Sequence, residues 1–313
     1  MEFKHIPVLL EETIKGLNIK PDGIYVDCTL GGGGHSIEIL KKLNNGRLIC
    51  IDQDIDAIEN AKIKLENYIS KITFVKSNFK YFPEIMKELN IEYVDGILMD
   101  IGVSSYQIDR VDRGFSYIHD SELDMRMNQE QNLTARCIVN NYSIEDLTNI
   151  FYKYGEEKWS KRIAEFICES RKEKEIVTTF DLVEIIDKAV PLKVRKEAKG
   201  HYSKRVFQAL RIEVNNELNI LEECIPKMVN YLNEKGRICV ITFHSLEDRI
   251  VKNIFRELST GCICPPEIPI CVCGNKRKVK LITRKPISPS TREMEENSRS
   301  KSAKLRIVER VRD

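Results

Sequence analysis

The chain has 313 residues, of which 42% are hydrophobic, so it is long enough for about two domains and apolar enough to bury a core. Fifty Lys and Arg residues stand against 48 Asp and Glu residues, and the net charge of +2 neither favours nor excludes a polyanionic partner. Ten cysteines could belong to a secreted, disulfide-rich protein, but the chain is long for that class. Its N-terminus also lacks the basic region and the apolar region of a signal peptide. We therefore expect a reduced, cytoplasmic protein. No apolar run approaches the roughly 18 residues that a membrane-spanning helix needs.

The first hundred residues alternate short apolar runs with amphipathic stretches, which is typical of a parallel sheet covered by helices. We expect strands at residues 23 to 28, 47 to 52, 71 to 76 and 93 to 102, and helices at residues 37 to 43 and 54 to 69. This order predicts an open α/β sheet.

The alternation stops after residue 104, and helical periods without a convincing strand continue to residue 208. One of these helices is expected to begin after Ser143, an N-cap residue with Asp146 three residues later, and another to end before Pro191. After Arg211 a long amphipathic helix is expected to be closed by Gly236. It is followed by a strand at 237 to 243, a helix at 245 to 258 and late strands at 278 to 284 and 304 to 310. The prediction is a discontinuous α/β domain, residues 1 to 106 and 209 to 313, with an inserted helical domain at residues 107 to 208.

Four consecutive glycines, Gly31 to Gly34, follow a strand and open a helix, where backbone N–H groups can approach a ligand. A phosphate-binding Walker loop ends in Gly-Lys, a pair that this chain lacks, and a dinucleotide fingerprint needs Gly or Ala where Ser36 stands. Both phosphate ligands are therefore disfavoured, although the glycine loop alone still permits a dinucleotide-dependent oxidoreductase.

Three predicted strands end in an aspartate: Asp27, Asp52 and Asp100. The carboxyl ends of parallel strands meet at the edge where open α/β sheets bind ligands. Asp52 can accept hydrogen bonds from ribose hydroxyls, and further carboxylates suit a cation better than a pyrophosphate. This pattern favours S-adenosylmethionine, whose sulfonium is positively charged.

Six long motifs resemble those of the bacterial 16S ribosomal RNA cytosine-N4 methyltransferases: TLGGGGHS (29 to 36), DIGVSSYQID (100 to 109), RGFSYIHDSELDMRM (113 to 127), YGEE (154 to 157), FQALRIEVNNEL (207 to 218) and ITFHSLEDRIVK (241 to 252). The resemblance covers essentially the whole chain. It implies a class I S-adenosylmethionine-dependent methyltransferase (Rossmann-like) sheet with an inserted helical, substrate-recognition domain. It also implies methylation of the N4 amine of cytosine 1402 in 16S ribosomal RNA, within the small ribosomal subunit, with neither DNA nor a membrane as partner. The weaker alternative outside enzymes is a non-catalytic ribosome-assembly protein.

The resemblance implies a set of contacts to S-adenosylmethionine. The matching residues are the loop residues Gly33, Gly34 and His35, the ribose-binding acid Asp52, Phe79 beside the adenine, and Asp100 and Gln107.

The substrate side of the site is left open by the sequence. Many amino-methyltransferases follow an Asp or Asn with two prolines and an aromatic residue, whereas here Asp100 precedes Ile, Gly, Val and two serines. The group that assists at N4 stays unidentified, and candidates for stacking on the target base are Tyr106, Phe115 and Phe243. The charged residues Asp109, Arg113, His119 and Arg126 either serve the substrate or are solvated loop charges.

Two segments are rich in basic residues: 193 to 205, with Lys193, Arg195, Lys196 and Lys199, and 276 to 285. Such runs are commonly solvated faces, but with an RNA substrate implied we expect them to contact phosphates.

Six cysteines are expected to be small core residues: Cys28, Cys50, Cys137, Cys168, Cys224 and Cys239. The other four, Cys262, Cys264, Cys271 and Cys273, lie within twelve residues, in C-x-C pairs. A structural zinc ion and a metal-free reduced loop both remain open, because zinc sites more often use C-x-x-C pairs. Ser245 with Asp248 is expected to cap a helix.

Overall fold

The computed structural model describes residues 7–104, 107, 108, 110–198, 200–265, 267, 270 and 272–311. The chain folds as two compact units: unit 1 consists of Met1–Gly102 and Leu218–Asp313, and unit 2 of Val103–Glu217. Each unit has its own buried hydrophobic residues. Among the helices described, none is long and apolar enough to cross a membrane.

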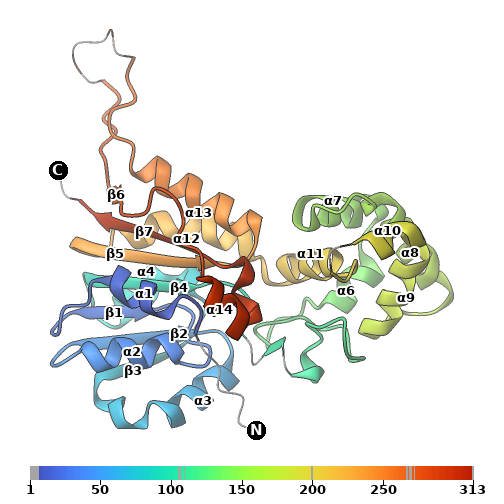
Figure 1. Ribbon diagram of the computed structural model, residues 1–313, viewed down its shortest axis with the longest axis horizontal. Helices are drawn as coiled ribbons and strands as arrows, with labels where there is room; N and C mark the ends of the chain where they lie inside the picture. The colour runs from blue at the N-terminus through green and yellow to red at the C-terminus, as the bar shows by residue number, and fades with distance from the viewer. Residues whose placement is uncertain are drawn as a thin grey trace. The chain divides into compact units, whose positions relative to one another are not determined.

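Unit 1 is built on a seven-stranded sheet with the strand order β3-β2-β1-β4-β5-β7-β6 (Figure 1). The strands are β1 (Ile24–Asp27), β2 (Arg47–Asp52), β3 (Ile72–Lys76), β4 (Val94–Asp100), β5 (Leu232–Thr242), β6 (Val279–Leu281) and β7 (Lys304–Arg310). The first five strands pair in parallel, and β7 runs antiparallel to both β5 and β6. This arrangement is typical of class I S-adenosylmethionine-dependent methyltransferases, and the predicted fold class is confirmed.

Helices pack on both faces of the sheet because side chains alternate between the faces along each strand. In β2, Ile49 and Ile51 join the core on one side, whereas Leu48 and Cys50 join the core on the other. The helices of unit 1 are α1 (Leu10–Leu17), α2 (Gly34–Lys42), α3 (Ile55–Lys64), α4 (Phe82–Glu88), α12 (Glu217–Val229), α13 (Ser245–Leu258) and α14 (Thr291–Glu296), with α12 beginning at the last residue of unit 2.

The expectation that Gly236 closes a helix was wrong. Helix α12 ends at Val229, and Gly236 lies within β5. The register of β5 on β4 shifts between Val94 and Gly96, and a side chain at Gly236 would collide with the carbonyl of Asn233. The glycine therefore marks an irregularity in a strand, where the backbone comes close to itself.

The described residues of unit 2 form helices and loops with one isolated bridge, between Glu122 and Thr178. Ser143 caps its helix as predicted, since its side chain accepts a hydrogen bond from the Asp146 backbone N–H (3.1 Å). The helices are α6 (Ala135–Asn141), α7 (Ile144–Gly155), α8 (Ser160–Glu173), α9 (Thr179–Ala189), α10 (Leu192–Glu197) and α11 (Lys204–Asn215).

The end of unit 2 is set by helix α11. This helix is continuous across residues 208 and 209, where the sequence places a domain boundary, and Phe207, Leu210 and Val214 all belong to the core of unit 2. Asn216 then takes a left-handed backbone conformation (φ 51°) and separates α11 from α12. That the inserted unit recognises the substrate stays a prediction.

Candidate functional site

The glycine loop between β1 and α2 bends toward the end of β2. Gly31 and Gly33 have positive φ angles of 46° and 67°, and the N–H of Gly31 donates to the Oδ2 atom of Asp52 (2.8 Å). A side chain at Gly34 would collide with the ring of Pro7. Among the described residues, no side chain caps the start of α2, and its N-cap residue Gly33 donates its N–H to the Leu30 carbonyl (2.8 Å).

Asp27 at the end of β1 is buried, and its carboxylate is held within the protein. The Ser36 hydroxyl donates to Oδ2 (2.7 Å), and the Thr29 N–H donates to Oδ1 (3.1 Å). Burial raises the pKa of Asp27, although these hydrogen bonds oppose the shift. Ser36, which departs from the dinucleotide fingerprint, thus holds the first carboxylate in place.

Asp52 at the end of β2 is half-buried and accepts two backbone hydrogen bonds. Oδ2 accepts from Gly31, as described above, and Oδ1 accepts from the Asp54 N–H (2.9 Å). Burial raises its pKa to about 6, with further increases from the nearby charges of Asp54 and Asp27, against the two N–H donors. Asp52 is therefore both a fastening point of the glycine loop and a carboxylate at the ligand edge of the sheet.

Asp100 at the end of β4 differs from the other two, because one of its oxygens is buried without a partner. Within the described part of the chain, Oδ1 has no hydrogen bond, whereas the backbone N–H is held by the Thr29 hydroxyl oxygen (2.6 Å). Burial, followed by the charges of Asp27 and Glu247, raises the pKa of Asp100 to about 8. A buried acceptor of this kind is costly unless a ligand donates to it.

His35 lies beside Asp100 and is buried in the first turn of α2. Its Nε2 atom is 3.1 Å from the carbonyl oxygen of Val8, an acceptor, so Nε2 carries the proton. Nδ1 faces Oδ2 of Asp100 at 3.6 Å, which is too long for a hydrogen bond. The imidazole thus packs against the second oxygen of Asp100 and leaves Oδ1 for another group.

Phe79 and Gln107 lie in different units. Phe79 begins a short 3-10 helix (Phe79–Tyr81) and packs half-buried against the core of unit 1. The loop before it is tied to the end of β2 by a hydrogen bond from the Ser77 N–H to the Asp52 carbonyl (2.9 Å). Gln107 is buried in unit 2, where its side chain accepts from the Ser104 N–H (3.1 Å). The structure thus brings Gly33, Gly34, His35, Asp52 and Asp100 to one edge of the sheet in unit 1.

Two of the arginines considered for the substrate have structural contacts instead. Arg113 is buried, and its guanidinium donates to the carbonyls of Arg126 (2.9 Å) and Met127 (3.1 Å). Arg126 forms a two-point ion pair with Asp124 (2.8 and 2.7 Å) and also donates to two loop carbonyls. His119 is exposed, and Asp109 lies outside the described residues.

The aromatic candidates for base stacking also separate. Phe115 packs half-buried against the core of unit 2. Phe243 packs half-buried against the core of unit 1, beside Gly102, which has a φ of 115° just after β4. Tyr106 lies outside the described residues. Of the described pair, only Phe243 belongs to the unit that carries the glycine loop.

The cap of α13 was predicted one residue too late. His244 is the N-cap residue, and the buried Glu247 completes a capping box, accepting from the N–H groups of Phe243 (2.8 Å) and His244 (3.2 Å). Asp248 instead binds Arg306 (2.7 Å). The His-x-x-Glu spacing was the signal available in the sequence. Glu247 matters to the site because its charge contributes to the raised pKa of Asp100.

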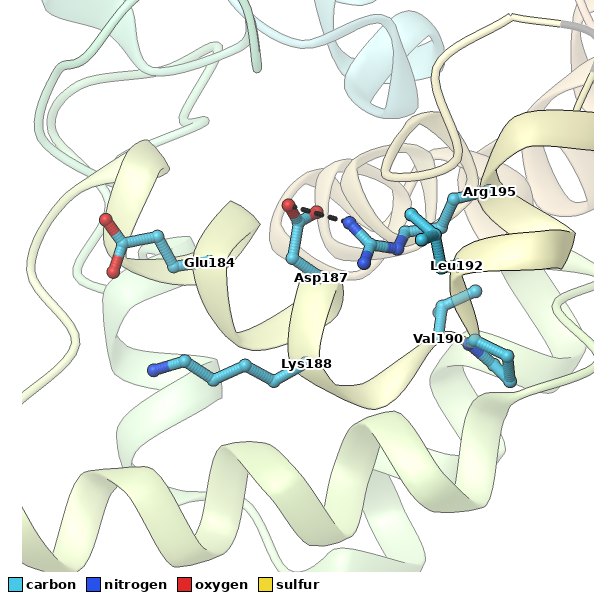
Figure 2. A pocket seen from close by; sticks show the side chains of 7 residues that line it. Glu184, Asp187, Lys188, Val190, Leu192 and Arg195 are labelled. Carbon is cyan, nitrogen blue, oxygen red and sulfur yellow. Dashed lines mark ion pairs between the residues drawn. The ribbon is translucent and has the colours of Figure 1, made fainter.

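The two basic segments differ in how their charges are used. In the hollow lined by Glu184, Asp187, Lys188, Val190, Pro191, Leu192 and Arg195, the Arg195 guanidinium pairs with Asp187 (3.0 Å) (Figure 2). It also lies over the Tyr202 ring, whereas Lys193 and Lys196 are exposed and Lys199 lies outside the described residues. In the second segment, residues 276 to 285, the lysines and arginines are all exposed.

Five of the six scattered cysteines are buried, as predicted: Cys28, Cys50, Cys168, Cys224 and Cys239. The prediction was wrong for Cys137, which is half-exposed on α6 because its Sγ atom faces the Asn132 carbonyl in a loop. Hydrogen bonds from Thr134 lower the pKa of the Cys137 thiol.

The sequence matches known proteins over almost its whole length. Residues 2–311 match the model of the MraW methylase family. The chain is 60% identical over 311 residues to ribosomal RNA small subunit methyltransferase H of Finegoldia magna, covering 99% of this chain and 100% of that protein. Proteins of the same name from Clostridium botulinum and Lachnospira eligens are 59% and 56% identical over 312 residues, which cover 99% of this chain and 100% and 99% of those proteins. The chain belongs to the MraW methylase family.

Proposed function

We propose that this protein transfers the methyl group of S-adenosylmethionine to the N4 amine of cytosine 1402 in 16S ribosomal RNA of the small subunit. Family membership supports the reaction class, and the relatives named above are small-subunit ribosomal RNA methyltransferases. The observation that carries the proposal concerns the Oδ1 atom of Asp100, which is buried beside the glycine loop. Among the described residues, this atom has no hydrogen-bond partner.

The residues at the edge of the sheet fit S-adenosylmethionine. Asp52 offers carboxylate oxygens to the ribose hydroxyls, and the backbone at Gly33 and Gly34, where α2 begins, is proposed to approach the ligand closely. Phe79 would lie beside the adenine. The Oδ1 atom of Asp100 would accept from a donor that the ligand or the substrate amine supplies. His35 acts as a positioning residue, since it packs against Oδ2 of Asp100. Gln107, in unit 2, completes the proposed set.

When bound, S-adenosylmethionine supplies an electrophilic methyl group on a positively charged sulfur. The task of the chain is to hold the cytosine amine in line with that methyl group at near-contact distance. The amine is a poor nucleophile because its lone pair is delocalised into the ring. A carboxylate that accepts one of its N–H bonds would favour the reactive, pyramidal nitrogen and stabilise the developing positive charge. Asp100 is the group proposed for this contact, in its ionised form, which the positive charge of the bound cofactor favours.

The alternative functions have less support. A dinucleotide-dependent oxidoreductase would need Gly or Ala at position 36, where the Ser36 hydroxyl instead donates to Asp27. A non-catalytic assembly protein would have no use for a buried carboxylate oxygen without a partner. The partner proposed for the exposed basic residues is ribosomal RNA, and a cytoplasmic location goes with that partner.

Methylation of small ribosomal subunits from cells that lack this activity tests the proposal. With S-adenosylmethionine, the wild-type protein should methylate cytosine 1402 at N4, as mapped on the isolated RNA. Asp100→Ala should weaken cofactor binding or turnover by roughly 10- to 100-fold, the equivalent of one charge-assisted hydrogen bond. Glu59→Gln, an exposed change on α3, is the matched control. Methylation at another base, or unchanged cofactor affinity and turnover in Asp100→Ala, would contradict the proposal.

A further inference from the structure

The loop between α13 and β6 is long and has no core of its own. Figure 1 shows it extending away from the sheet of unit 1. None of its described residues from 260 to 278 is buried or belongs to a helix or strand. Its apolar side chains face solvent, with Ile263, Ile270 and Val272 exposed by 65%, 75% and 76%. Hydrophobic packing therefore does not explain how this loop is held.

Three thiols of this loop lie close together. The Sγ atoms of Cys262, Cys264 and Cys273 all lie within 4.8 Å of one another, and those of Cys262 and Cys273 are 3.8 Å apart. These separations are far longer than the S–S bond of a disulfide, which is about 2.05 Å. Sulfurs bound to one tetrahedral zinc ion by bonds of about 2.3 Å are separated by about 3.8 Å. The spacing matches shared coordination.

Backbone N–H groups point at the same sulfurs. Ile263 donates to Cys273 (3.4 Å), Cys264 donates to Cys262 (3.4 Å) and Val272 donates to Cys264 (3.4 Å). Asn275 also donates to Cys273 (3.5 Å), and its side chain donates to the Gly261 carbonyl (2.7 Å). Backbone N–H groups that donate to sulfur orient the cysteine ligands of metal sites.

We infer that Cys262, Cys264 and Cys273 bind a structural Zn²⁺ ion as thiolates. Thiolate ligands select zinc over magnesium or calcium, which prefer oxygen. The short C-x-C spacing alone left zinc binding open. In the folded loop, Cys273 lies next to Cys262 and Cys264, so three sulfurs are close enough to share one ion. The sequence has a fourth thiol in the same run, Cys271, which lies outside the described residues. The ion replaces the thiol protons, so binding releases protons and weakens at low pH.

The site shares no residue with the one proposed above for methyl transfer, and it can be tested without an activity assay. The full-length protein, purified under reducing conditions without chelator, should contain one zinc ion per chain by elemental analysis. After removal of zinc, titration with Co²⁺ alone should give the intense visible absorption of a tetrahedral thiolate complex, and added Zn²⁺ should abolish it. Hydrogen exchange at the amides of Ile263, Cys264 and Val272 should be slower with zinc than without it.

Variants separate this site from nonspecific thiol binding. Cys262→Ser and Cys273→Ser should each lower zinc affinity at least tenfold, whereas Cys137→Ser, which removes a half-exposed thiol on α6, should leave it unchanged. The loop cysteines lie outside the cores, so circular dichroism of each variant should match the wild type. A reduced wild-type protein that takes up neither Zn²⁺ nor Co²⁺ would overturn the inference. Equal zinc affinity in Cys262→Ser, Cys273→Ser and the wild type would also overturn it.

Discussion

At the residue scale, three aspartates in equivalent positions have different chemistry. Asp27 accepts from the Ser36 hydroxyl and the Thr29 N–H, and Asp52 accepts from two backbone N–H groups. Asp100 keeps one buried oxygen without a partner in the described part of the chain. All three end a parallel strand, so the difference comes from which hydrogen-bond donors the fold brings to each carboxylate.

The raised pKa of Asp100 makes protein stability depend on pH. Burial, with the charges of Asp27 and Glu247, raises this pKa from 3.8 to about 8, so the folded protein keeps a proton that the unfolded chain releases. The stability contributed by Asp100 is complete below about pH 4 and is lost progressively up to about pH 8. Asn cannot ionise, so Asp100→Asn should gain stability relative to the wild type over this interval.

Urea unfolding of both proteins at several pH values across this range checks the prediction, with Glu59→Gln on the exposed face of α3 as the control. The difference between Asp100→Asn and the wild type should grow with pH and level off above about pH 8. A difference that stays constant with pH would show that Asp100 keeps an ordinary pKa in the folded protein.

Two neighbouring glycines provide a matched test of the loop backbone. Gly33 has a φ of 67°, a backbone conformation that costs other residues roughly 1–2 kcal/mol. Gly32 does not have a positive φ, and no atom lies within 4 Å of a side chain built there. Gly33→Ala should therefore lower the free energy of unfolding by about that amount, and Gly32→Ala should change it little. Equal effects in denaturant unfolding would mean that backbone strain does not set the glycine requirement.

At the scale of elements, residues of the long motifs connect loops to helices in unit 2. Asn215 at the end of α11 accepts from the Met127 N–H (2.8 Å) and donates to the Met125 carbonyl (2.8 Å). Arg113 donates to the carbonyls of residues 126 and 127. These contacts fasten the segment from 113 to 127 to the helical core, so motif residues that look suited to RNA shape the loop instead.

Removing Arg113 should destabilise unit 2. Arg113→Ala leaves two carbonyls without this donor, each worth about 1–3 kcal/mol when buried, so thermal unfolding should shift to a lower temperature. Arg110→Ala is the control, because Arg110 is exposed and forms a surface ion pair with Asp112 that contributes about 0–1 kcal/mol. If Arg113→Ala unfolds like Arg110→Ala but binds RNA more weakly, Arg113 serves the substrate after all.

At the scale of the whole molecule, a net charge of +2 averages over unlike regions. Three acids lie at the edge of the sheet, whereas exposed lysines and arginines gather in residues 193 to 205 and 276 to 285. A nearly neutral total therefore coexists with local basic surfaces that suit a polyanion.

Neutralising Lys193 and Lys196 should weaken RNA binding and its dependence on salt, if the proposed function is right. Each phosphate contact contributes about 0.7 to the slope of log affinity against log salt for a single strand, so the double change to Gln should reduce the slope by roughly 1.4. Arg195→Gln is the control: Arg195 pairs with Asp187, so the change should affect thermal stability more than the slope. A slope that the double variant leaves intact would place the RNA elsewhere.

Much of the fold could be predicted because it depends on local alternation. The predicted strands at 47 to 52 and 304 to 310 match β2 and β7 residue for residue. In β2 the signal is a continuous apolar run, which is typical of a strand buried on both faces. The prediction that Gly236 ends a helix was wrong because a glycine can mark a close backbone approach in a strand as well as the end of a helix. Only the pairing of β5 with β4 shows that Gly236 lies within a strand.

The sequence by itself determined the sheet, the helical insertion, the glycine loop and the family. It also supplied the residues of the candidate site. Only the tertiary structure showed that Asp27 accepts a hydrogen bond from Ser36 and that Arg113 and Arg126 stabilise a loop. It also showed that His244, and not Ser245, caps α13, and that three cysteines lie close together. The physical reason is that secondary structure follows from residues close in the chain. Burial and hydrogen-bond partners, which decide the chemistry of a side chain, depend on residues that only folding brings together.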